Sequence, residues 1–206
     1  MDEQGRAEGL EWAVASRPLP GEVTSGDAAV VAAAGDRTLV AAIDALGHGP
    51  EAARAAAAAT SILREFAGED LVSVVRRCDD ALRGTRGAAI SAASFSAAEA
   101  TMTWLGVGNV EGRLIRADSG RPGAVEDVLL RGGAAGHELP PLAPATLPVR
   151  RGDLVVFATD GVDGSFADDR ELTGPPELMA EHILAEHASG RDDALVVIVR
   201  VLGRYA

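Results

Sequence analysis

The chain is poor in aromatic residues, cysteine, positive charge and long apolar runs. Aromatic residues make up 3% of its 206 residues although 47% are hydrophobic, so the core must be built from small side chains such as Ala and Val. A single cysteine, Cys78, cannot form an internal disulfide, which favours a cytoplasmic location. No apolar run reaches membrane-spanning length, and the acidic N-terminus lacks the apolar segment of a signal peptide.

The shortage of positive charge restricts the partners. There are 31 acidic residues against 19 basic ones, which gives a formal net charge of −12. Such a field opposes nucleic acid and anionic membranes and attracts cations. We therefore expect neither nucleic acid nor a membrane as a partner, and an anionic substrate would need local help from a metal ion or an arginine.

What is present is a regular alternation of short apolar segments. The length suits one domain over residues 10–206, preceded by a flexible N-terminus over residues 1–9. Apolar spacing predicts helices over 50–66, 69–83 and 176–187. Alternating or continuous apolar runs predict strands over 10–16, 27–34, 37–44, 88–95, 101–107, 113–117, 125–130, 153–158 and 194–202.

These elements predict an α+β fold. Several strands are apolar on both faces, so each sheet needs cover on both sides. A parallel sheet would need a crossover helix for nearly every strand, and three helices are too few. We therefore predict a four-layer α/β/β/α sandwich in which two stacked antiparallel β-sheets are flanked by helices. Residues 132–149, which are rich in proline and glycine, are expected to form a loop or an irregular edge.

Aspartates stand at the ends of the most apolar strands. They are Asp27, Asp44, Asp160 and the pair Asp192-Asp193. Each alone is typical of a turn, but together they indicate a shared site. Two carboxylates ~4 Å apart repel by about 4 kcal/mol at an effective dielectric near 20. Divalent cations would remove this repulsion, and hard oxygen ligands favour Mg²⁺ or Mn²⁺ over zinc.

The motifs around these aspartates carry a family resemblance. SGD, DALGHG, ATDGV and GRDDALVVIV occur in the order of the PPM, or type 2C, metal-dependent Ser/Thr protein phosphatases. The segment GVGNVEGRL resembles the compact RsbX-like and SpoIIE-like members. The resemblance implies a phosphoserine/phosphothreonine protein phosphatase with two Mn²⁺ or Mg²⁺ ions and a metal-bound water as the nucleophile. Its implied substrates are phosphorylated regulatory proteins of the stressosome scaffold or STAS type.

The same resemblance assigns the ligands. Asp44 would bridge both ions and serve catalysis, and the backbone carbonyl of Ala45 would bind the second ion together with Asp27. Asp160 and Asp192 would hold the first ion. Asp193 is the alternative to Asp192, and otherwise a residue that makes turn hydrogen bonds.

The segment Gly47-His48-Gly49 leaves alternatives open. His48 is either a catalytic residue or a surface turn residue, because it stands four residues after Asp44 where the larger phosphatases have a His two residues after. Gly47 and Gly49 permit a tight turn into a helix whose N-terminus could attract phosphate, and Arg17 is a candidate phosphate ligand. The rival interpretations are a pseudophosphatase, which binds phosphorylated partners without turnover, and a structural domain stabilised by cations.

Overall fold

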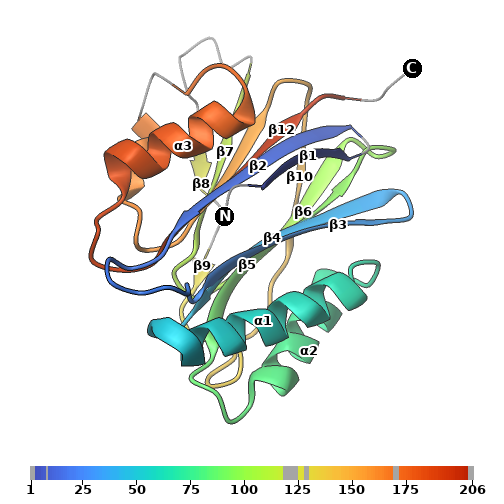
Figure 1. Ribbon diagram of the computed structural model, residues 1–206. Coiled ribbons are helices and arrows are strands. Elements are labelled where there is room, and N and C mark those ends of the chain that lie inside the picture. The colour runs from blue at the N-terminus through green and yellow to red at the C-terminus, as the bar shows by residue number, and fades with distance from the viewer. Residues whose placement is uncertain (1–2, 8, 118–124, 128–129, 169–171, 204–206) are drawn as a thin grey trace.

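A computed structural model of the chain describes residues 3–7, 9–117, 125–127, 130–168 and 172–203. Two β-sheets stack face to face, and helices cover the outer face of each (Figure 1). The predicted α/β/β/α sandwich is therefore confirmed. In the described part of the chain, no helix is both long enough and apolar enough to span a membrane.

The first sheet contains both terminal parts of the described chain. Its strand order is β1-β2-β12-β11-β7-β8, and its strand pairs are antiparallel. Its strands are β1 (Glu3–Ala7), β2 (Leu10–Arg17), β12 (Ala194–Val201), β11 (Leu154–Ala158), β7 (Glu111–Ile115) and β8 (Val125–Asp127).

The second sheet is a meander of β3 to β6 to which β9 and β10 are added beside β6. Its order is β10-β6-β5-β4-β3, and β9 pairs with β6 in parallel. Its strands are β3 (Asp27–Ala34), β4 (Arg37–Ala45), β5 (Ala88–Ser96), β6 (Thr101–Val107), β9 (Leu130–Arg131) and β10 (Ala145–Pro148). Proline is tolerated in β10 because that strand lies at the edge of the sheet.

Three apolar layers separate the four layers of structure. The helices α1 (Gly49–Glu65) and α2 (Leu71–Leu82) pack on the second sheet through an Ala-rich layer. The helix α3 (Pro176–His187), with the short 3-10 helix η1 (Gly164–Asp168), covers the first sheet. Between the sheets, the rings of Trp104 and Phe157 stack with centroids 4.5 Å apart, so two of the few aromatic residues fill the centre.

Three sequence-based expectations need correction. Residues 3–7 form β1, because their backbone pairs with β2 and so gains ladder hydrogen bonds; the predicted flexible N-terminus is wrong for them, and residues 1–2 and 8 lie outside the described residues. The predicted strand over 125–130 is two strands, since β8 pairs in the first sheet and β9 in the second. The second sheet is consequently mixed rather than purely antiparallel.

Candidate functional site

The fold brings the predicted aspartates to one end of the sandwich. Asp27 opens β3 and is the direct cross-strand partner of Asp44 near the end of β4. Asp160 comes two residues after β11, and Asp192 two residues before β12. The two sheets therefore contribute two carboxylates each to the cluster formed by Asp27, Asp44, Asp160 and Asp192, which we call the acidic cluster.

Burial and repulsion perturb the carboxyl groups of Asp27, Asp44 and Asp160. Desolvation by burial, followed by the charge of Asp44, raises the pKa of Asp27 from 3.8 to about 8. Desolvation, followed by the charges of Asp160 and Asp192, raises the pKa of Asp44 to about 7. The pKa of Asp160 is also raised, by burial and then by Asp192. Such raised values mark a site that lacks compensating positive charge.

Two neutral side chains hold members of the acidic cluster, and the sequence analysis singled out neither. The Thr159 hydroxyl donates to Asp27 Oδ2 at 2.6 Å and accepts from the Leu195 amide at 2.9 Å. It thereby joins the second sheet to the first. Asn109 Nδ2 donates to Asp160 Oδ2 at 2.7 Å. Both residues stand within motifs quoted above, ATDGV and GVGNVEGRL, which was the available signal.

Asp193 has a structural task. Its Oδ1 accepts from the Leu19 amide and its Oδ2 from the Gly26 amide, each at 2.7 Å. The expected turn hydrogen bonds are instead contacts with a segment far away in sequence, the loop that leads into β3. Both carboxylate oxygens are thus engaged, whereas Asp192 is exposed and accepts one bond, from the Asp193 amide.

The carbonyl of Ala45 is left open by the same arrangement. The Ala45 amide donates to the Gly26 carbonyl at 3.1 Å, but the Gly26 amide donates to Asp193 instead of returning the bond. A Cβ at position 26 would meet the Ala52 Cβ at 2.8 Å and the carbonyl oxygens of Ala45 and Gly47 at 3.1 Å. Glycine at this position therefore lets the backbone pass close to α1 and leaves both carbonyl oxygens uncovered on that side.

The turn after Asp44 uses glycine where the backbone demands it. Gly47 and Gly49 have φ values of 91° and 76°, a region that other residues rarely adopt. His48 between them is the N-cap of α1 and is exposed. Its Nδ1 lies 2.9 Å from Glu22 Oε1, and the Glu22 carboxylate also lies against Gly49. A phosphate at this helix N-terminus would compete with Glu22.

Arginines approach the acidic cluster from its margins. Arg17 ends β2 opposite Ala194 and is exposed. Arg86, which the sequence analysis did not single out, lies against Gly47 and pairs with Glu51 at 3.3 Å. Within the described residues, none of the members of the acidic cluster forms an ion pair with an arginine or a histidine.

The donor set suits a hard divalent cation. As the side chains stand, the described residues contain no group of three His, Cys, Asp or Glu side chains that would hold one ion. Mg²⁺ usually keeps several waters and takes only one or two carboxylates directly. Paired carboxylates with raised pKa values, next to an open backbone carbonyl, match that preference.

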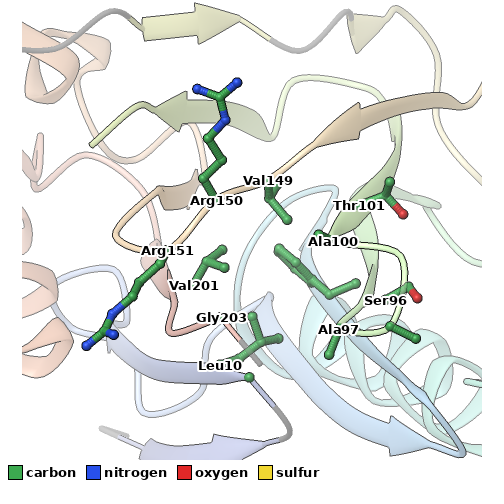
Figure 2. Close-up of a pocket in the computed structure, with 13 residues that line it drawn as sticks. Leu10, Ser96, Ala97, Ala100, Thr101, Val149, Arg150, Arg151, Val201 and Gly203 are labelled. Carbon is green, nitrogen blue, oxygen red and sulfur yellow. The ribbon is translucent and has the colours of Figure 1, made fainter. Parts of the chain in front are cut away.

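The opposite end of the sandwich carries a different hollow, shown in Figure 2. A pocket of about 430 Å³ lies there between the sheets, with Leu10, Phe95, Val149 and Val201 among its lining residues. The side chains of Arg150 and Arg151 extend away from the apolar residues (Figure 2). Among the described residues, the lining of this pocket contains no carboxylate, histidine or cysteine, so the acidic cluster is the candidate site for acid–base or cation chemistry.

Comparison with known proteins agrees with this geometry. The family described as stage II sporulation protein E (SpoIIE) matches residues 34–204. This chain belongs to the SpoIIE family. The match runs from the end of β3 through β12 and so includes Asp44, Asp160 and Asp192.

An individual relative and two solved structures are also similar. The phosphoserine phosphatase RsbX of Bacillus subtilis (strain 168) is 35% identical over 78 residues, which are 37% of this chain and 39% of RsbX. A structure of RsbX in complex with magnesium has a TM-score of 0.86 at 22% identity, over 98% of this chain and 100% of that one. A chain from work on the bacterial stressosome as a modular system adapted to control secondary messenger signalling has a TM-score of 0.83 at 28% identity, over 94% and 100% of the two chains.

Proposed function

We propose that this chain is a metal-dependent protein phosphatase that hydrolyses phosphoserine or phosphothreonine in regulatory proteins. The observation that carries the proposal is the acidic cluster, in which carboxylates from two sheets are partly desolvated and lack an ion-pair partner among the described residues. Membership of the SpoIIE family supports the reaction class.

The ligand roles follow from which oxygens are free. We assign Asp44 as the bridge between two Mn²⁺ or Mg²⁺ ions. It is the cross-strand partner of Asp27, and it lies close enough to Asp160 and Asp192 for their charges to raise its pKa. The Ala45 carbonyl and Asp27 would hold one ion. Asp160 and Asp192 would hold the other; Asp192 is preferred over Asp193, whose oxygens are already engaged.

Bound cations would supply charge neutralisation for the phosphoryl oxygens and would lower the pKa of the attacking water. The cations would also favour the ionised carboxylates, and the chain itself would hold these side chains in position. Asn109 fixes Asp160, and Thr159 fixes Asp27 from the other sheet. Arg17 and Arg86 stand at the margins, where a phosphate dianion would need positive charge in a chain of net charge −12.

His48 and its neighbouring glycines receive a smaller role in this proposal. The His48 ring is exposed and paired with Glu22, so it would tie the loop before β3 to the start of α1. Gly47 and Gly49 would shape the turn beside Ala45. A direct proton transfer from His48 or a phosphate contact at Gly47 and Gly49 remains the competing assignment.

The proposed substrates are phosphorylated regulators of the stressosome scaffold or STAS type, and the proposed compartment is the cytoplasm. The supporting facts are the similarity to RsbX and to a chain from a study of the stressosome. The substrate identity can be tested by offering phosphorylated scaffold and STAS proteins in parallel and comparing kcat/KM.

The decisive experiment measures phosphate release from p-nitrophenyl phosphate with Mn²⁺, with Mg²⁺ and with EDTA. Turnover should require the cation and should disappear in Asp44→Asn. Equal rates in EDTA and in Mn²⁺ would contradict metal dependence. Binding of a phosphopeptide without release of phosphate under all conditions would establish the pseudophosphatase instead. A cation-dependent rise in Tm without either binding or turnover would establish a structural domain.

A further inference from the structure

The outer edge of β3 is unusually open for a strand of its length. Among the described strands, β3 has β4 on one side and no neighbour on the other. After Asp27 its sequence is AAVVAAA, without charge or proline. Exposed edges normally carry charged residues, proline or a very short strand, because unpaired backbone groups invite another chain.

The remaining sheet edges show those protections. The strand β1 has five residues and carries Glu3 and Arg6, β8 has three residues, and β10 has four and includes Pro148. The strand β3 has eight. It lies at the rim of the sandwich between α1 and the strands β1 and β2 (Figure 1).

The ladder register identifies which backbone groups face outward. The Ala45 amide donates to the Gly26 carbonyl, so Gly26 and Ala45 form a hydrogen-bonded pair. Such pairs alternate along an antiparallel ladder, and the N–H and C=O groups of Ala29, Val31 and Ala33 therefore point away from β4. The Asp27 amide, in the same phase, donates to Ser25 Oγ and not to β4.

A groove follows the first half of this edge and ends at the acidic cluster. Its volume is about 480 Å³, and it is lined by Asp27, Ala28 and Ala29 of β3 together with Thr60 and Arg64 of α1. The loop before β3 adds Val23, whose side chain is 94% exposed. Arg64 is exposed and has no ion pair within the described residues.

We propose that an extended segment of the phosphorylated substrate protein adds to this open edge as an extra strand and so leads its phosphoserine into the acidic cluster. The inference rests on the proposed function and adds to it the mode of substrate recognition. Main-chain hydrogen bonds to Ala29, Val31 and Ala33 would supply affinity. At about 3.3 Å a residue, a five-residue segment covers the strand from Ala33 to Ala29, and two further residues bring it level with Asp27.

The charge and shape of the edge favour a peptide over a second copy of the chain. Pairing two copies through β3 would bring together two chains of net charge −12 and close the groove in front of Asp27. A substrate segment instead leaves that groove available, and an acidic residue beside its phosphoserine would meet Arg64, which lines the groove and has no ion pair within the described residues. Since Ala28 and Ala32 pack toward the helices, and Ala29 and Val31 toward the first sheet, the added strand should carry apolar side chains in alternation.

The test compares two substrates and two variants. The probe is a synthetic peptide whose phosphoserine is flanked on each side by alternating valine and threonine, and p-nitrophenyl phosphate is the small reference substrate. Val31→Pro removes an outward N–H that the ladder to β4 does not use, which an edge strand tolerates. Val31→Thr keeps that N–H. We expect Val31→Pro to lower the ratio of kcat/KM for the peptide to kcat/KM for p-nitrophenyl phosphate by about tenfold, and Val31→Thr to leave this ratio within about twofold of wild type.

An N-methylated version of the probe peptide tests the same main-chain hydrogen bonds without altering the protein. N-methylation of alternate amides keeps the side chains and removes the donors, so this peptide should lose about tenfold in kcat/KM with the wild-type chain. Turnover of p-nitrophenyl phosphate with no effect of either change would overturn the docking proposal and leave the phosphatase intact. A wild-type dimer that Val31→Pro converts to a monomer, with peptide turnover unaffected, would assign the edge to a second copy. No turnover of any substrate would refute the proposed function itself.

Discussion

The two ends of β11 carry carboxylates in opposite situations. Asp153, just before the strand, is 1% exposed and has a complete set of donors: Arg116 Nη1 at 2.9 Å, the Arg150 amide at 3.0 Å and the Ala117 amide at 3.1 Å. Asp160, about 20 Å away along the strand, accepts a hydrogen bond from one neutral donor, Asn109. Its pKa is raised by burial and by the charge of the neighbouring Asp192. The same residue type is a structural anchor at one end and a group in need of a cation at the other.

The difference teaches where to look for chemistry in such a fold. A buried carboxylate with all its bonds made contributes to stability and has no capacity left for a ligand. Carboxyl groups such as Asp27, Asp44 and Asp160, whose pKa values are raised by burial and repulsion, store unfavourable energy in the folded state when they are ionised. Each of the following tests either sharpens or breaks this contrast between the ends.

The largest expected effect is that of Asp44→Asn. Losing the proposed bridging ligand should reduce turnover of p-nitrophenyl phosphate by about 1,000-fold or more, because cation assistance is worth several kcal/mol. The far-UV circular dichroism should stay that of the wild type. A variant with full activity would show that Asp44 takes no part in the mechanism and that the acidic cluster is not the catalytic site.

Asn109→Ala should have the next largest effect. The Asn109 amide donates a hydrogen bond to Asp160. Groups that orient a metal ligand in this way typically contribute about 10–100-fold in metal affinity or activity. A titration of activity with Mg²⁺ should show a weaker apparent affinity that is partly rescued at high concentration. An unchanged titration curve would show that Asp160 needs no positioning.

Asp153→Asn tests the opposite end. Because Asn cannot replace both charged and backbone contacts, we expect a loss of about 1–3 kcal/mol in the free energy of unfolding, measured by urea denaturation. The Mg²⁺ dependence of the remaining activity should match that of the wild type. A changed Mg²⁺ dependence would mean that the two ends are not separate in function.

The chelated protein should lose stability as the pH rises from about 4 to about 8. Over this range the unfolded chain ionises Asp27 and Asp44 near 3.8, whereas the folded chain holds protons up to about 8 and about 7. The folded state thus binds more protons, so ΔG of unfolding falls with rising pH. In EDTA the Tm should drop by at least about 3 °C.

Saturating Mg²⁺ provides the control for the pH experiment. A bound cation would favour the ionised carboxylates, so it should flatten or reverse the dependence on pH. A Tm that rises between pH 4 and 8 in EDTA would contradict the raised pKa values of the acidic cluster. Asp44→Asn in EDTA should show a smaller drop than the wild type, since one repelling charge is gone.

The smallest expected effect belongs to His48→Ala. An exposed pair such as His48–Glu22 typically contributes about 0.2–1 kcal/mol, and a role in fixing the loop should change kcat less than tenfold, as about 1.4 kcal/mol would. A loss above about 100-fold, with an altered basic limb of the pH profile, would instead identify His48 as a proton donor.

The sequence predicted the layers well because their cause is local. Apolar spacing was enough for α3, which begins and ends where expected, and for β3 and β6. Polar segments near the chain's beginning gave a wrong expectation at β1, since its stability comes from pairing with β2 and not from its own composition. The division of residues 125–131 between two sheets likewise depends on partners distant in sequence.

For the candidate site, the sequence predicted the carboxylates but not what holds them. Asp27, Asp44, Asp160 and Asp192 follow from their places at strand ends. The bonds of Thr159 to Asp27 and of Asn109 to Asp160 join segments 132 and 51 residues apart, and no spacing rule reports such pairs. The open edge of β3 was equally hidden, because a sequence shows a strand without showing which neighbour is missing.

The hydrogen bonds between the Asp193 carboxylate and the loop before β3 have a consequence for biosynthesis. The Gly26 amide must wait for a carboxylate that is translated 167 residues later, although β3 and β4 can pair as soon as they emerge. A nascent chain can therefore pair β3 with β4 early. The loop that leads to Asp27 gains its hydrogen bonds to Asp193 only when the segment before β12 is in place. Catalytic competence would therefore arise later than the pairing of β3 with β4, once the segment that carries Asp193 is in place.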